Sequence, residues 1–156
     1  MTATTSLRPT AEEDVLSAAE PRTAGAAAAL GRAANRVERR IEELVRPPHG
    51  PGLDAWRVLD LLADGEGHPM SEIAAHAMVP APTLTKIVDR LVERGLVYRR
   101  PDEIDRRRVL VLLAARGREL HGSLRAGVDA VEREVHDALG PDADLVLAAL
   151  ERLRHS

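Results

Sequence analysis

Hydrophobic residues recur at spacings of three and four through most of the chain, which is the pattern of amphipathic helices. In the first such segment Leu30, Val37 and Ile41 fall on one face, and prolines and glycines interrupt the pattern between Pro47 and Gly52. Proline lacks an amide donor and glycine favours turns, so the helix is expected to end there. The same period and similar breaks predict six helices. They cover residues 22–46, 53–63, 71–77, 81–94, 115–139 and 141–154.

The period changes between the fourth and fifth of these helices. Residues 96–100 and 107–113 are short runs of β-branched and apolar residues, and the polar turn PDEID lies between them at 101–105. Two such runs around a polar turn predict a β-hairpin with a charged tip. The expected fold class is therefore mainly α with one small hairpin. Helix, turn, helix and hairpin in this order make a winged helix-turn-helix, in which the hairpin is the wing.

The composition fits a helical core and excludes the kinds of site that need cysteine. The chain has no Phe, one Trp and one Tyr, and its apolar residues are largely Ala, Leu and Val. Cysteine is absent, which excludes disulfides, cysteine-ligated zinc, iron–sulfur clusters and a thiol nucleophile. No apolar run is long enough to span a bilayer and no signal peptide is evident, so a cytoplasmic protein is expected. Residues 1–21 contain few large apolar residues and are expected to form a flexible arm before one domain, 22–156.

Positive charge is concentrated in the fourth predicted helix and the hairpin, although the chain carries −3 overall. The segment from Lys86 to Arg108 has eight cationic and five acidic residues, so it carries +3 and the remainder −6. Mixed charge on a helix is ordinarily a solvated surface. Here the order of elements adds a second reason, because a helix fits the major groove of DNA and arginine is favoured in the minor groove.

Candidate DNA contacts lie off the apolar stripe of the fourth helix and in the hairpin. Short hydroxyls at the start of a helix and cations further along suit phosphates and base edges. The candidates are Pro82, Thr83, Thr85, Lys86 and Arg90 on the helix, and Arg106, Arg107 and Arg108 in the hairpin.

The sequence contains no motif typical of an enzyme or of a metal site. There is no phosphate-binding glycine loop, no G-x-S-x-G and no H-E-x-x-H, so no catalytic residue is predicted. The six histidines show no spacing typical of metal ligands. We therefore expect no enzyme, no metal and no cofactor. The alternative to DNA binding is a winged helix that serves as a protein-interaction module.

Two segments resemble the MarR family of bacterial transcription regulators. They are LTKIVDRLVERGLVYRR (84–100) and DRRRVLVLLAARGREL (105–120). The first contains Asp89, Leu91, Gly95, Leu96 and Val97, which match the end of the family's recognition helix and the start of its wing. The second contains Asp105 and Arg107 in the wing, and Gly117 in the helix that follows.

The resemblance implies a homodimeric repressor that binds a pseudo-palindromic operator in double-stranded DNA. Residues 53–114 would form the DNA-binding lobe, and 22–46 and 115–154 the dimerisation helices. Arg107 would enter the minor groove, and Asp105 would hold its guanidinium through a charge-assisted hydrogen bond.

The resemblance also implies a small aromatic or phenolic effector that binds between the dimer helices and the lobe. Trp56 and His49 are its candidate contacts, and the alternative is that Trp56 is ordinary core and His49 an exposed loop residue. The chain departs from the family at three points. VPAP (79–82) stands where a capping hydroxyl is common, Ile104 where a wing-tip arginine is frequent, and Ala114 where threonine commonly opens the next helix.

Overall fold

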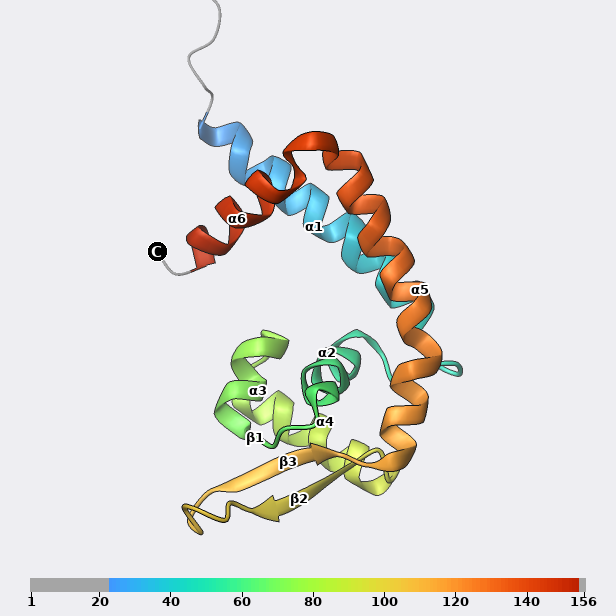
Figure 1. The fold of residues 1–156 in the computed structure, drawn as a ribbon, viewed down its shortest axis with the longest axis vertical. Coiled ribbons are helices and arrows are strands. Elements are labelled where there is room, and N and C mark those ends of the chain that lie inside the picture. The colour runs from blue at the N-terminus through green and yellow to red at the C-terminus, as the bar shows by residue number, and fades with distance from the viewer. Residues whose placement is uncertain (1–22, 155–156) are drawn as a thin grey trace, which may run out of the picture. The chain divides into compact units, whose positions relative to one another are not determined.

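The computed structural model describes residues 23–154 (Figure 1). The arm expected at residues 1–21 lies outside the described residues. The chain divides into two compact units between Ala34 and Asn35, inside the first helix. The fold and the site below belong to the second unit.

The mainly helical fold with a small hairpin is confirmed, and no helix end differs from its predicted position by more than two residues. No helix within residues 23–154 combines the length and apolarity that crossing a membrane needs. The helices are α1 (Thr23–Val45), α2 (Leu53–Leu61), α3 (Met70–Ala77), α4 (Ala81–Glu93), α5 (Ala115–Leu139) and α6 (Ala143–Arg154), with 3-10 turns η1 (Leu62–Asp64) and η2 (Gly140–Asp142).

The sheet has one strand more than the sequence predicts. Strands β2 (Val97–Pro101) and β3 (Val109–Leu113) form the expected antiparallel hairpin, with Val97 opposite Leu113. A two-residue strand, β1 (His68–Pro69), pairs with the other edge of β3 and gives the order β1-β3-β2. The sequence predicts only a turn at this point, because two residues cannot show the alternation that identifies a strand.

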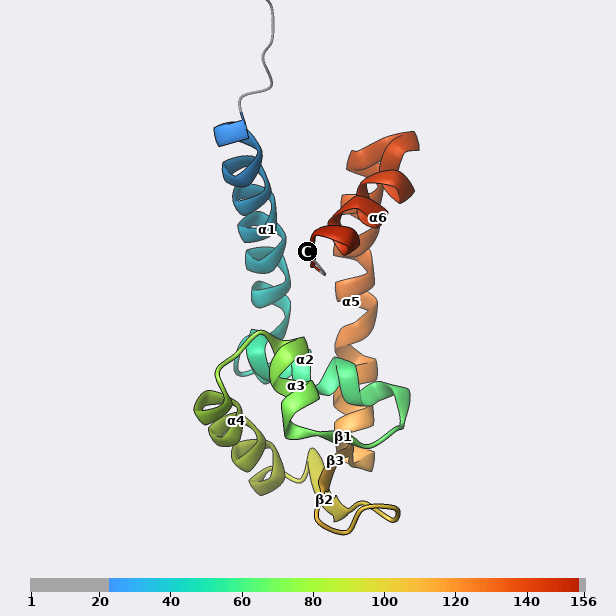
Figure 2. The ribbon, with the colours of Figure 1, turned by 90° about the vertical axis from the view of Figure 1, so that its left-hand side faces the viewer.

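The main core lies between α2, α3, α4 and the sheet, which Figures 1 and 2 show grouped together. Leu59 of α2, Ile73 of α3, and Leu84 and Leu91 of α4 are almost completely buried there, against Val111 of β3. The stripe on α4 at spacings of three and four is thus the face that holds this helix on the lobe. Its other faces are left exposed.

A second buried cluster joins α2 to the end of α1 and to α5. Trp56 is 3% exposed and packs with Val45 and Val128. Its ring stacks on that of His121, with centroids 4.9 Å apart and planes 8° from parallel. Asp60 of α2 lies 2.8 Å from both His121 Nε2 and Arg125 Nη1 of α5. Stacking and hydrogen bonds therefore fix α5 to α2.

A histidine holds the short strand β1 in place. His68 Nε2 lies 2.8 Å from Asp64 Oδ2 of η1, and Nδ1 lies 3.1 Å from Glu72 Oε2 of α3. Carboxylates only accept hydrogen bonds, so both contacts are satisfied together when the imidazole is protonated. Burial lowers the pKa of His68, but the hydrogen bonds and negative charges of Asp64 and Glu72 outweigh it and raise the pKa.

Candidate nucleic-acid interface

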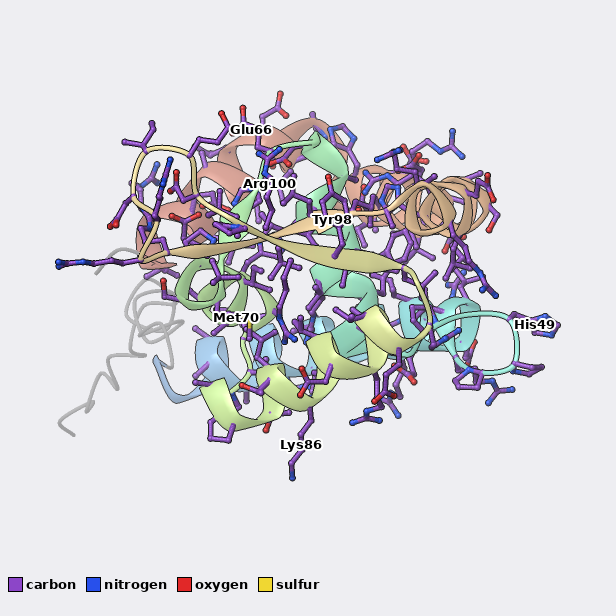
Figure 3. All side chains as sticks on the ribbon, turned by 90° about the horizontal axis from the view of Figure 1, so that it is seen from below. His49, Glu66, Met70, Lys86, Tyr98 and Arg100 are labelled. Carbon is purple, nitrogen blue, oxygen red and sulfur yellow. The ribbon has the colours of Figure 1, made fainter. Side chains whose placement is uncertain are left out.

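Helix α4 is amphipathic, and its polar residues lie on its exposed sides. Its buried residues are Leu84, Ile87, Val88 and Leu91, and all five predicted contacts on the helix are exposed. Lys86 extends from α4 away from the rest of the lobe (Figure 3). It forms no ion pair within the part of the chain that the structure describes. The single lysine of the sequence is therefore free to meet a negatively charged partner.

Backbone hydrogen bonds define the start of α4. The N-cap is Pro80, whose carbonyl accepts the amides of Thr83 at 2.9 Å and Leu84 at 3.0 Å. Pro82 has no amide hydrogen, so it leaves one fewer unsatisfied donor in the first turn. No side chain caps the helix, as the VPAP sequence predicts. The hydroxyl of Thr85 donates to the carbonyl of Ala81 at 3.0 Å, which leaves its oxygen able to accept.

Thr83 and Arg90 lie on the side of α4 that faces the loop between α1 and α2. There they line a cavity of about 630 Å³. Arg90 Nε donates to the carbonyl of Lys86 at 3.2 Å, so its side chain folds back along the helix. The cavity contains further charged groups, among which Arg94 is basic and Glu42, Asp54 and Glu93 are acidic. The five helix candidates thus divide between an outward side and this cavity.

The wing is the β2–β3 hairpin with its tip, residues 102–108, and the tip is closed by hydrogen bonds. Asp102 N donates to Arg108 O at 3.0 Å, and Arg108 N donates to Asp105 O at 2.8 Å. The carboxylate of Asp105 accepts the backbone amide of Arg107 at 3.1 Å. The expected bond from Asp105 to the Arg107 guanidinium is not made in this structure, where the carboxylate accepts the Arg107 amide.

The same bonds shorten the second strand of the hairpin. The sequence predicts a strand from residue 107, but β3 begins at Val109. Arg106, Arg107 and Arg108 therefore belong to the tip, where all three side chains are exposed. None of them forms an ion pair with a residue that the structure describes.

An ion pair joins the wing to α4, as the mixed charge of this region allows. Arg99 Nη2 of β2 lies 2.7 Å from Asp89 Oδ1 of α4. Arg100 has a weaker partner in Glu103, at 3.8 Å. Asp89 is one of the residues that carry the family resemblance, but only the packing identifies Arg99 as its partner. The pair is half-exposed, and such a pair contributes ~0.2–1 kcal/mol.

Helix α4 and the wing therefore lie on the same face of the lobe, which is the face seen in Figure 3. The family model for "MarR family" matches residues 53–109, from the start of α2 to the start of β3. Over these residues the chain is similar to the MarR family.

Curated and solved transcription regulators are also similar to this chain. The HTH-type transcriptional regulator FarR of Neisseria gonorrhoeae is 33% identical over 95 residues, which is 61% of this chain and 65% of FarR. The chain thus spans just under two thirds of that relative's length. The transcriptional repressor CouR, solved bound to a 23-mer DNA duplex, is 28% identical with a TM-score of 0.66, and covers 82% of this chain and 91% of its own.

A second similar structure contains a small molecule. NadR in complex with 4-hydroxyphenylacetate is 26% identical with a TM-score of 0.68, and the match covers 81% of this chain and 90% of NadR. The two residues expected at an effector site do not meet in this chain. Trp56 is buried in the core beside His121, and His49 is exposed in the loop after α1. Neither residue lines the cavity beside α4.

Proposed function

We propose that this protein is a sequence-specific DNA-binding regulator, a homodimeric repressor that a small molecule releases from its operator. One observation carries the DNA-binding part. Lys86 on α4 and Arg106, Arg107 and Arg108 in the wing are exposed and unpaired among the described residues, while the neighbouring Arg99 is held by Asp89. Free cations on a protruding helix and hairpin suit the major groove, the minor groove and the phosphates between them.

The partner that α6 favours is a second copy of the chain. Four leucines of this helix are exposed although each is large and apolar: Leu145 at 67%, Leu147 at 43%, Leu150 at 38% and Leu153 at 63%. Burying such a surface is favourable. A twofold dimer would present two copies of α4 and of the wing, and would match a pseudo-palindromic operator.

The effector would occupy the cavity beside α4. Its volume of about 630 Å³ suits a small aromatic molecule. A phenolic hydroxyl would donate to a carboxylate such as Glu42 or Glu93, and an acidic group would accept from Arg90 or Arg94. Because Thr83 and Arg90 are also predicted DNA contacts, a molecule bound here would compete directly for them. The bound 4-hydroxyphenylacetate in NadR supports this class of effector.

The test starts by selecting duplexes from a random-sequence pool with the full-length protein. The selected duplex is then titrated at several salt concentrations with wild type and with R107A. We expect R107A to weaken binding and to reduce the slope of log affinity against log salt by about 1, because one phosphate or groove contact is lost. R133A is the control, because Arg133 is exposed and lies outside α4 and the wing, and the mass of this variant in sedimentation velocity should equal that of wild type.

The outcomes separate the parts of the proposal. Unchanged affinity in R107A, with the circular dichroism spectrum of wild type, would show that the wing assignment is wrong. Failure to select any duplex would refute DNA binding and favour the protein-interaction module. The effector is tested in the same titration by adding hydroxyphenylacetates and hydroxybenzoates, each of which should lower the affinity for DNA if it is recognised.

A further inference from the structure

The wing tip holds one large apolar side chain out in solvent. Ile104 is 98% exposed, the highest value among the exposed large hydrophobic residues of the described chain. A single exposed apolar residue is common on soluble proteins. This one differs because it lies at the outermost part of the element that is proposed to meet DNA, between Asp102 and Asp105.

The turn around Ile104 is ordered by its neighbours. Asp102 Oδ1 accepts the amide of Ile104 at 2.9 Å, and the tip is closed by the backbone bonds between Asp102 and Arg108 and between Arg108 and Asp105. The backbone that carries this side chain is therefore ordered before any partner binds, which lowers the entropy lost on contact.

The acidic charges beside Ile104 are matched in number by the arginines of the tip. Asp102, Glu103 and Asp105 carry three negative charges, and residues 106–108 carry three positive ones. Glu103 also lies 3.8 Å from Arg100 of β2. The three arginines that follow have no ion-pair partner among the described residues. The tip thus combines an exposed apolar side chain with arginines that form no ion pair among the described residues. Proteins that enter the minor groove use the same combination.

We propose that Ile104 is an apolar wedge, which the wing inserts into the minor groove to open a base step and bend the operator. This inference rests on the DNA binding proposed above and adds a determinant of sequence preference. Pyrimidine–purine steps unstack and kink most easily. The protein should therefore prefer operators with a TA or CA/TG step where each wing tip reaches, although no hydrogen bond reads that step.

The experiment uses the full-length protein and the duplex selected by wild type. Adenines flanking the selected site are replaced one at a time with 2-aminopurine, whose fluorescence rises when its neighbour unstacks. Wild type, I104A and I104L are compared for fluorescence and for affinity, the latter at several salt concentrations. Leucine keeps the number of carbon atoms of isoleucine, so I104L is the matched control for loss of apolar bulk.

We expect wild type and I104L to raise the fluorescence at one step on each side of the site, and I104A to lose this rise. I104A should bind about tenfold more weakly. Its salt slope should equal that of wild type, because no ionic contact is lost, whereas R107A should lower the slope. Replacing the flexible step by an A-tract should weaken wild type and leave I104A unaffected.

Other outcomes overturn the wedge. If I104A binds as tightly as wild type and unstacks the same step, Ile104 has no role, while the effect of R107A still supports DNA binding. Equal loss in I104A and I104L also contradicts the proposal, because bulk would not be the property that matters. If wild type selects no duplex, the proposed function fails and this inference fails with it.

Discussion

Gly117 in the first turn of α5 allows a prediction with a control in the same helix. A Cβ built on Gly117 would overlap the carbonyl oxygen of Leu96, and would lie 2.8 Å from Leu113 Cδ1. That carbonyl also accepts the amide of Ala114 at 2.9 Å, so it cannot turn aside without breaking the bond between the N-cap residue of α5 and the residue before β2. A Cβ on Gly122, five residues later, would meet no atom within 4 Å.

The two alanine substitutions should therefore change the free energy of unfolding in opposite directions. Alanine in a helix is favoured over glycine by about 1 kcal/mol, and G122A should gain this amount. G117A gains the same term but loses ~1–3 kcal/mol to overpacking and ~1 kcal/mol to the strained hydrogen bond. The net result for G117A is a loss of about 2 kcal/mol.

Thermal unfolding followed by circular dichroism measures both changes. For a chain of this length, about 2 kcal/mol corresponds to a Tm roughly 4–8 °C lower for G117A, and G122A should rise by roughly 2–4 °C. All samples need the same protein concentration, because dimer formation would itself shift Tm. If both substitutions moved Tm in one direction, or if G117A matched wild type, the argument from close packing at Leu96 would be refuted.

Two further predictions concern His68 and α6. The folded pKa of His68 lies above its ordinary 6.5 because Asp64 and Glu72 outweigh burial, so its protonated form stabilises the fold fully below about pH 6.5 and this contribution is lost as pH rises through the folded pKa. In urea unfolding H68Q should fall further below wild type at about pH 5.5 than at about pH 8.5, and equal differences would contradict the ionic role. On α6, L145E should convert a dimer to a monomer in sedimentation velocity, because a carboxylate would be buried in an apolar interface. V109E, a matched change at another exposed apolar residue, should leave the mass unchanged, and a dimer that persists in L145E would remove α6 from the interface.

The local pattern predicted most of the elements. The stripe of α4 and the breaks at Pro47–Gly52 and Gly95 depend on neighbours within one or two turns, so period and turn residues were sufficient. Strand β1 was missed because His68 and Pro69 owe their strand geometry to pairing with Val111 and Leu110. The start of β3 was placed too early because the Asp105 carboxylate withdraws the amide of Arg107 from the ladder.

The sequence by itself determined the helical period, the position of the hairpin and the concentration of cations between Lys86 and Arg108, since these are properties of adjacent residues. Only the tertiary structure decided which of those cations stay free. Asp89 and Arg99 are ten residues apart and meet because α4 packs on β2. Asp60 meets His121 and Arg125 across more than sixty residues, and Trp56 joins that cluster and not the cavity. Contacts of this kind depend on how the elements pack. The spacing of apolar residues along the sequence shows which face of each element is buried, but not which residues of other elements it meets.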